Sequence, residues 1–377
     1  MKDMKVANVI FLRSNPVAPY PRVEKDAKAL FLNGYNVIIL AWDRTGSLPE
    51  KEIKEFALIQ RIRIVAPFGE GFRNILNLLR WNFCLLSYLF RHRERYQIIH
   101  ACDFDTILPA LLMRLLFHKK VVYDICDFYA DSRFNLPVWL RNLIRKTEIW
   151  AIGEADALIL PDRARVEQIK GSNPRKLEFI YNSPEKVQCD GNFARSNSQL
   201  LITYVGIFDR VRGLVEMIDI VARHLDWRLN LAGFGRDENM ILEHACKLPN
   251  VNIFGRIPYR KALELYSEAD ALFATYDPSI PNHRYSSPNK LFEAMMLGKP
   301  IIVCEGTGMD SIVKAYGLGF VIKYGDVNNL EKILIEIASW NHKFREKFSE
   351  RARSIYENHF SWEIMAERLV NLYRELI

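Results

Sequence analysis

Short runs of β-branched and other apolar residues alternate along this chain with longer segments whose apolar residues recur at helical spacing. In the first half we expect strands at residues 7–12, 36–40, 97–101, 120–125 and 157–160, with helices at 22–33, 72–93 and 105–117. In the second half we expect strands at 201–206, 228–233, 251–255, 271–275, 300–303 and 319–322, with helices at 213–224, 237–247, 260–268, 289–297 and 328–339. Such alternation is typical of a parallel sheet with helices on both faces.

The two halves are separated by residues 182–199, a polar stretch without hydrophobic period that we interpret as a linker. A chain of 377 residues also exceeds the size of one ordinary hydrophobic core. We therefore predict an α/β protein with two Rossmann-like, doubly wound domains facing a central cleft, at residues 1–185 and 186–360, and a terminal helix at 361–377. Ligands of such sheets bind outside the carboxyl ends of the strands, so the turns that follow the strands are the candidate sites.

Composition and charge narrow the class of protein. The chain is 49% apolar and 26% charged, and its net charge of +7 permits nucleic acid, an anionic membrane surface or phosphorylated ligands as partners. Nucleic acid is disfavoured, because the basic residues are interleaved with Leu and Phe. Six scattered cysteines without a CxxC pair indicate reduced thiols in a cytoplasmic protein and no metal site. The N-terminus does not resemble a signal peptide, and the uncharged segment 81–90 is too short to span a bilayer.

The turn after the strand 201–206 carries a candidate phosphate site. The strand ends at Gly206, and Arg210 and Arg212 precede a helix that begins near Gly213. A helix N-terminus offers free N–H groups and the positive end of its dipole, and two arginines add charge. The alternative is a pair of solvated surface arginines.

Two further turns are candidates for nucleotide contacts. Gly233 and Gly235 follow the next strand, where glycines would let a ligand approach the main chain or would simply form a tight turn. Arg256 and Ile257 lie in the turn after the strand 251–255, where a flat base would fit against main-chain groups.

The segment "SSPNKLFEA" reads as a helix start with charged residues in its first turn. Ser287 and Asn289 flank a proline, and Lys290 and Glu293 are three residues apart and therefore share one face. We expect Lys290 to meet a phosphate and Glu293 to accept hydrogen bonds from the vicinal hydroxyls of a ribose. The alternative is an ordinary Glu–Lys surface pair.

These pieces resemble glycosyltransferase family 4, whose members are retaining enzymes of the GT-B architecture that use nucleotide sugars. The resemblance covers nearly the whole chain and rests on "YVGIFDRVRGL", "LAGFG" followed by "NIFGRIPY", "PNKLFEAMMLGKPIIV" and the terminal "FSWEIMAERLVNLYREL". It implies that Glu293 binds the donor ribose, that the basic pair Arg210 and Arg212 holds the diphosphate, and that the turn at Arg256 and Ile257 binds the base. It also implies an N-terminal acceptor-binding domain, a C-terminal nucleotide-sugar-binding domain and a terminal helix that crosses back to the first.

The chain departs from the family pattern in both halves. The family often has a second glutamate eight positions before the helix glutamate, and Tyr285 stands there. Many relatives have a histidine followed by an acid where this chain has Cys126 and Asp127. Both departures bear on recognition of the donor sugar.

Four residues after the first-half strands are candidates for the acceptor side. Arg22 heads the first helix and is equally well explained as a solvated charge. His100 and Asp103 lie at a strand end and helix start, where an aspartate can also act as a cap. Asp127 is a candidate acceptor-side carboxylate and, with Arg212 and Lys290, a candidate catalytic residue.

Two basic, amphipathic segments, 72–96 and 134–150, are typical of helices that lie on anionic lipid, although a core-facing helix with a basic back has the same pattern. We expect the arginines of the first segment to face the lipid headgroups and Trp81, Phe83 and Leu86 to add apolar burial. The sequence therefore predicts a cytoplasmic, peripheral membrane enzyme with a lipid-linked or saccharide acceptor.

The predicted reaction is transfer of a sugar from a nucleoside diphosphate sugar with retention of configuration. Arg210, Arg212 and Lys290 would stabilise the leaving diphosphate, so that neither a cofactor nor a metal ion is required. Two other classes fit the same architecture: a nucleotide-sugar epimerase, and a non-catalytic descendant that binds nucleotide sugars.

Overall fold

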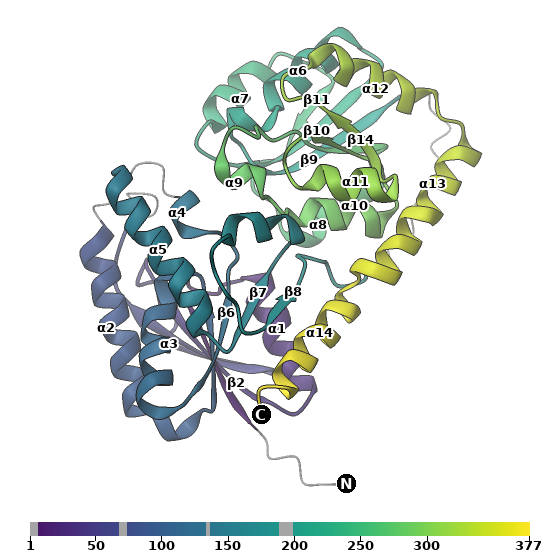
Figure 1. Ribbon diagram of the computed structural model, residues 1–377. Coiled ribbons are helices and arrows are strands. Elements are labelled where there is room, and N and C mark those ends of the chain that lie inside the picture. Colours follow the sequence, from purple (N-terminus) through teal and green to yellow (C-terminus); the bar gives the residue numbers. More distant parts are fainter. Residues whose placement is uncertain (1–6, 68–73, 133–135, 188–198) are drawn as a thin grey trace. The chain divides into compact units, whose positions relative to one another are not determined.

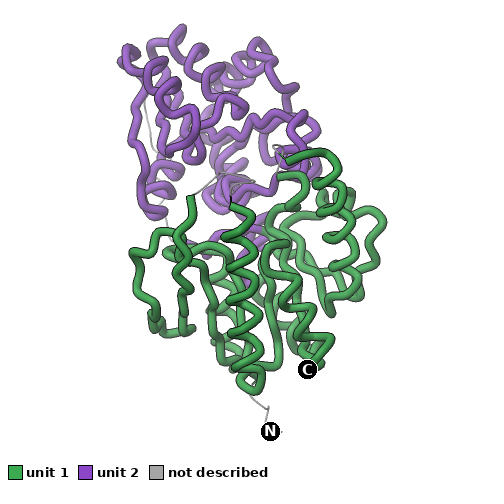
Figure 2. Tube along the Cα trace, turned by 90° about the vertical axis from the view of Figure 1, so that its left-hand side faces the viewer, with its two compact units in different colours: residues 1–181, 365–377 green, residues 182–364 purple. Residues whose placement is uncertain are grey.

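The computed structural model describes residues 7–67, 74–132, 136–187 and 199–377, and it divides the chain into two compact units. Unit 1 comprises Met1–Tyr181 and Met365–Ile377, and unit 2 comprises Asn182–Ile364 (Figure 2). Most of the predicted linker and the first residues of the two predicted basic segments lie outside the described residues.

Unit 1 is built on an eight-stranded sheet in the order β3-β4-β2-β1-β5-β6-β7-β8 (Figure 1). Neighbouring strands are parallel except for the edge pair β3–β4. The strands are β1 (Asn8–Arg13), β2 (Asn36–Asp43), β3 (Lys51–Lys54), β4 (Ala57–Arg63), β5 (Ile98–Cys102), β6 (Lys120–Asp124), β7 (Ala157–Leu160) and β8 (Leu177–Phe179). The sequence analysis missed β3, β4 and β8, because charged residues interrupt the first two and the third has only three residues.

Helices cover this sheet, and the end of the chain returns to it. The helices are α1 (Pro21–Leu32), α2 (Ile75–Arg91), α3 (Phe104–Phe117), α4 (Tyr129–Ser132) and α5 (Val138–Glu154), with short 3-10 turns at Arg93–Arg95 and Arg163–Ile169. The last helix, α14 (Trp362–Arg374), belongs to unit 1 from Met365 onward. Its Arg368 donates a hydrogen bond of 3.2 Å to the main-chain oxygen of Phe179.

Unit 2 contains a wholly parallel six-stranded sheet in the order β11-β10-β9-β12-β13-β14. Its strands are β9 (Leu201–Ile207), β10 (Arg228–Phe234), β11 (Val251–Ile253), β12 (Ala271–Ala274), β13 (Ile301–Cys304) and β14 (Gly319–Ile322). Its helices are α6 (Leu214–Arg223), α7 (Glu238–Ala245), α8 (Tyr259–Glu268), α9 (Pro281–Arg284), α10 (Asn289–Leu297), α11 (Met309–Tyr316), α12 (Val327–Ser339) and α13 (His342–Ile355), with one further turn at Tyr356–Phe360.

Each sheet has one point at which the strand order reverses. In unit 1 this switch point lies between β1 and β5, and in unit 2 it lies between β9 and β12. Chains leaving the two central strands there turn to opposite faces of the sheet, which opens a crevice at the carboxyl ends. The two switch points are therefore the first places to look for functional side chains.

None of the helices in the described part of the chain combines the length and the apolar character needed to cross a membrane.

Candidate functional site

At the switch point of unit 2, Arg212 lies against Tyr276. Arg212 ends the 3-10 turn Arg210–Arg212 after β9, and its guanidinium carbon is 4.4 Å from the centre of the Tyr276 ring. Gly213 follows with a φ of 68°, and a Cβ there would lie 2.2 Å from Oγ1 of Thr275. Only glycine fits this close approach, which brings the turn after β9 against the end of β12.

Lys290 reaches the same place from the first turn of α10. Its Nζ lies 3.2 Å from the centre of the Tyr204 ring and 6.0 Å from that of Tyr276. The residue is 4% exposed, and Nζ has no hydrogen-bond partner among the described residues. Burial, followed by the charge of Arg212, holds the pKa of Lys290 well below its usual value. The face of the Tyr204 ring offsets part of this cost, because its electron density attracts an ammonium group.

His283, which the sequence analysis did not single out, is the third basic residue of this group. It lies in the short helix α9, and its ring centre is 5.3 Å from that of Tyr276. Burial, followed by the charge of Arg212, lowers its pKa. Nδ1 of His283 and Nε of Arg212 resemble Nζ of Lys290 in being buried without a hydrogen-bond partner in the described structure. We call Arg212, His283 and Lys290, with the rings of Tyr204 and Tyr276, the cation cluster.

Glu293 lies on α10 one turn after Lys290 and is 4% exposed. Partial withdrawal from water and the negative charge of Glu293 raise the pKa of Tyr259, whose hydroxyl interacts with this carboxylate. The structure thus brings Glu293 into the first turns of α10 beside the cation cluster, as the three-residue spacing predicts. Ser287 is buried just before the helix, and its main-chain oxygen accepts a hydrogen bond of 2.8 Å from Asn182, whereas Asn289 is exposed.

The structure separates Arg210 from the cation cluster. The Arg210 side chain is largely exposed and forms an ion pair with Asp237, with 3.1 Å between Nη2 and Oδ1. This hydrogen-bonded pair lowers the pKa of Asp237 to about 2. Of the two arginines predicted to hold a diphosphate, only Arg212 joins the cluster, and the alternative of a surface residue fits Arg210.

Gly233 and Gly235, which follow β10, are glycines because the main chain of unit 2 leaves no space for a side chain there. A Cβ on Gly233 would lie 1.8 Å from the main-chain oxygen of Gly206, and one on Gly235 would lie 2.2 Å from that of Phe208. Contacts within the chain therefore require both glycines, as the alternative of a tight turn implies, and the approach of a ligand to Gly233 and Gly235 stays a prediction. Arg256 is exposed with its guanidinium carbon 4.8 Å from the Phe234 ring centre, and Ile257 beside it is half-buried.

At the switch point of unit 1, Asp103 connects the ends of three strands. Its Oδ1 accepts hydrogen bonds from the main-chain N–H groups of Cys126 (2.8 Å) and Asp127 (3.3 Å), and its other oxygen pairs with Arg13 at the end of β1. Asp103 has a φ of 64°, which is strained for a residue with a side chain. Burial raises its pKa, and the charge of Arg13 opposes that shift. The sequence analysis did not single out Arg13.

Asp127 remains open to solvent. Its side chain is 55% exposed and pairs with the buried Arg165 at 3.1 Å, while the main-chain contact to Asp103 fixes its position. This carboxylate is available to a ligand of unit 1, as a functional role requires.

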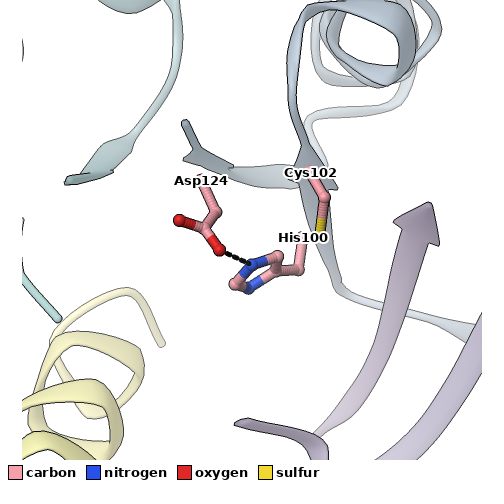
Figure 3. A group of neighbouring side chains, drawn as sticks. All are labelled: His100, Cys102 and Asp124. Carbon is pink, nitrogen blue, oxygen red and sulfur yellow. Dashed lines mark ion pairs between the residues drawn. The ribbon is translucent and has the colours of Figure 1, made fainter. Parts of the chain in front are cut away.

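His100 pairs with the buried Asp124 (Figure 3), and Arg22 also forms an ion pair with Asp124. Arg22 donates to both carboxylate oxygens of Asp124, at 2.9 and 2.7 Å, and Nδ1 of His100 lies 2.6 Å from the hydroxyl of Tyr373 on α14. His100 is fully buried, so its predicted contact with an acceptor is corrected to a structural contact with α14. Arg22 is likewise committed to Asp124.

His100, Cys102 and Asp124 have the residue types of a metal site, and their ligand atoms lie within 4.8 Å of one another. However, the Arg22 guanidinium already binds both oxygens of Asp124 and places a positive charge beside them. Burial also raises the pKa of the Cys102 thiol, which disfavours the thiolate that a metal ion needs. We therefore interpret the group as a polar core of unit 1.

Comparison with known proteins gives the family. The family model described as "Glycosyltransferase Family 4" matches residues 27–183, and the one described as "Glycosyl transferases group 1" matches residues 191–355, so that together they cover most of the chain. One curated relative is the capsular polysaccharide biosynthesis glycosyltransferase CapM of Staphylococcus aureus, which is 25% identical over 51% of this chain and 52% of its own. Another is a GDP-mannose-dependent monoacylated alpha-(1-6)-phosphatidylinositol monomannoside mannosyltransferase of Corynebacterium glutamicum, which is 30% identical over 41% of both chains. The chain thus spans about half the length of these relatives or less.

A solved structure gives the fold. The Anabaena protein HepE in complex with UDP-glucose is 13% identical, with a TM-score of 0.73 over 98% of this chain and all of its own. Together with the two parallel sheets, this similarity shows the GT-B fold, with two Rossmann-like domains.

Proposed function

Since the chain belongs to the family 4 and group 1 glycosyltransferases, we propose that it transfers a sugar from a nucleoside diphosphate sugar to an acceptor with retention of configuration. Names of similar proteins support donors of this class, since one relative is named for GDP-mannose and one similar structure contains UDP-glucose.

The cation cluster is the observation that carries this proposal. Arg212, His283 and Lys290 bring three buried basic nitrogens without hydrogen-bond partners, within the described residues, around two tyrosine rings. Buried donors without acceptors, here Nε of Arg212 and Nζ of protonated Lys290, are unfavourable, and buried like charges repel one another. A diphosphate supplies both the missing acceptors and the opposite charge, so its entry relieves both costs.

The same groups would promote the reaction. When the bond between the anomeric carbon and the diphosphate breaks, negative charge grows on the leaving phosphate oxygens. Arg212 and Lys290 face that charge from a water-poor site, where electrostatic stabilisation is strongest. Two fixed cations perform the task that a metal ion performs elsewhere, so we propose that no metal or other cofactor is required.

Glu293 and the exposed turn of unit 2 would hold the nucleoside. A carboxylate accepts two hydrogen bonds from the vicinal hydroxyls of a ribose, and Glu293 lies one helical turn from Lys290. Arg256 and Ile257 remain the proposed contacts of the base, and Ser287 and Asn289, at the start of α10, are proposed to contact the donor.

Unit 1 would bind the acceptor at its own switch point. Asp127 is exposed there and fixed through Asp103, which supports a role in orienting the acceptor hydroxyl. The strained Asp103 is a positioning residue in this account, because its carboxylate is fully engaged by Arg13 and two main-chain N–H groups.

The surface of unit 1 supports a membrane-bound acceptor. Helices α2, α3 and α5 pack in succession (Figure 1), and each has a stripe of large apolar side chains at helical spacing. The residues of these stripes that are at least half exposed are Leu76, Leu79, Phe83, Phe90, Leu115, Leu116, Val138, Trp139, Leu143 and Trp150. Exposed Arg80, Arg91 and Arg95 complement anionic headgroups. We propose that this three-helix face rests on the inner face of the cell membrane and that the acceptor is lipid-linked.

Trp81 does not belong to this face. It is fully buried and stacks on Trp42 with 5.4 Å between ring centres, which corrects the expectation that it would reach the bilayer.

A panel of nucleotide sugars tests the proposed function. We expect the protein to release nucleoside diphosphate from one donor, and NMR of the product to show the anomeric configuration of that donor. Glu293→Ala should weaken donor binding by about 2–3 kcal/mol, because it leaves the ribose hydroxyls without a charged partner. Lack of binding and of turnover with every donor, at full folding, would contradict the proposal.

A further inference from the structure

His283 occupies the cation cluster as a neutral ring. Nδ1 of this ring is buried and has no hydrogen-bond partner in the described structure. A neutral imidazole carries its proton on one nitrogen and a lone pair on the other, so it can take up a second proton.

The groups that face this ring explain why it remains neutral. Arg212, beyond the Tyr276 ring, repels a charged imidazole, and the carboxylates of Asp209 and Asp277 favour it less strongly. Lys290 reaches Tyr276 from 6.0 Å and adds positive charge to the same cluster when it is protonated. The result of burial and these charges is a pKa below the usual value of histidine.

We propose that His283 takes up one proton from solution when the diphosphate of the donor enters the cation cluster. This inference rests on the proposed function, because it requires a diphosphate at this site. The diphosphate brings two negative charges and thereby reverses the potential at the ring. The incoming proton bonds to the free lone pair of the imidazole, so that both ring nitrogens of the imidazolium, Nδ1 included, are N–H donors and one of them can bind the anion.

The proposal fixes the sign of the pH dependence. Protonation that accompanies binding makes donor affinity rise as pH falls through the interval between the pKa values of the free and the occupied site. Lowering the pH from 8 to 6 should therefore strengthen binding about five- to tenfold, since each pH unit across that interval contributes at most a factor of ten.

Isothermal titration in two buffers of different protonation enthalpy, phosphate and Tris, measures the proton uptake directly. UDP-glucose and GDP-mannose are suitable probes, because a diphosphate diester has no ionisation near neutral pH and any proton must be bound by the protein. His283→Gln is the test variant. His244→Gln is the matched control, since His244 belongs to the same unit and pairs with Asp219 at 2.7 Å on its surface.

We expect the parent and the His244→Gln variant to take up a substantial fraction of one proton per donor at pH 7. His283→Gln should bind the same donor at pH 8 within about tenfold of the parent, with most of the parent's proton uptake lost and a flatter affinity from pH 8 to pH 6. Donor binding by the parent with no uptake, or uptake in His283→Gln as large as that of the parent, overturns this inference alone and leaves the proposed function intact. Failure of the folded parent to bind any nucleotide sugar overturns both.

Discussion

The ammonium nitrogen of Lys290 lies 3.2 Å from the centre of the Tyr204 ring. The ring is held there by its own hydroxyl, which donates a hydrogen bond of 2.8 Å to the main-chain oxygen of Ile207. In this arrangement an aromatic face occupies the position in which an acceptor of hydrogen bonds would be expected. Within the described residues, Nζ of Lys290 therefore has no hydrogen bond to give up when a diphosphate arrives.

Lys290→Met tests this relationship. The change keeps most of the side-chain volume and removes the charge, so we expect affinity for the nucleotide sugar to fall about 10- to 100-fold, as when a charged hydrogen bond is lost. Titration calorimetry provides the measurement. The matched control is Lys261→Met on α8, where an exposed lysine pairs with Glu264 at 3.1 Å and the affinity should not change. Equal losses in the two variants would mean that Lys290 acts only through the general charge of unit 2.

Arg212 and Arg210 provide a comparison within one turn of chain. Arg212→Lys loses the planar fork that binds two phosphate oxygens, and we expect kcat to fall about 10- to 100-fold, more than the affinity does. Arg210→Lys should change kcat by about twofold or less, because Arg210 is an exposed partner of Asp237. Steady-state kinetics of both variants measures kcat. A larger loss of kcat in Arg210→Lys than in Arg212→Lys would assign the phosphate contact to Arg210.

The comparison also shows what the sequence could predict. Strand and helix periodicity identified both parallel sheets and α10, and the order Lys290, Glu293 placed both side chains in one helical turn. Nothing local distinguishes Arg210 from Arg212, because the difference comes from Asp237, which lies on another turn. The burial of His100 depends in the same way on Tyr373, which follows it by 273 residues.

Tyr276 and His283 were missed for a related reason. Tyr276 directly follows the predicted strand 271–275, so the rule that ligands bind in the turns after the strands could have identified it. His283 lies in a loop without period, and only the packing of α9 shows that its ring meets Tyr276.

The buried carboxyl of Glu148 makes the stability of the protein depend on pH. This fully buried carboxyl on α5 accepts hydrogen bonds from the main-chain N–H groups of Tyr129 (2.8 Å) and Ala130 (3.0 Å), which hold the start of α4. Burial raises its pKa to about 8, even though those two hydrogen bonds oppose the shift. Between the unfolded pKa, about 4.3 for a free glutamate, and about 8, the folded chain holds one more proton than the unfolded chain, so stability falls as pH rises through this interval.

Urea unfolding of the parent and of Glu148→Gln at pH 5 and pH 8 tests this prediction. We expect the parent to lose about 1–3 kcal/mol more than the variant between the two pH values, because glutamine does not titrate. A parallel pH dependence of the two proteins would show that Glu148 is ionised in the folded state.

The three-helix face of unit 1 predicts binding to anionic membranes. Phe83→Ser combined with Leu116→Ser removes two exposed apolar side chains of α2 and α3, and should reduce co-sedimentation with anionic vesicles at least about tenfold. Leu225→Ser is the control, since Leu225 is an exposed leucine of unit 2, 77% exposed against 72% for Phe83 and 54% for Leu116. Binding of the parent should weaken at high salt, because the arginine contribution is screened. A parent that ignores vesicles in all conditions would favour a soluble acceptor.

A crystal structure of the protein with its donor nucleotide tests the central claim most directly, since that claim concerns one location. The account predicts the diphosphate within hydrogen-bond distance of Nζ of Lys290 and of the Arg212 guanidinium, with both ribose hydroxyls on the carboxylate of Glu293. A diphosphate bound elsewhere, with Lys290 still resting on Tyr204, would contradict it.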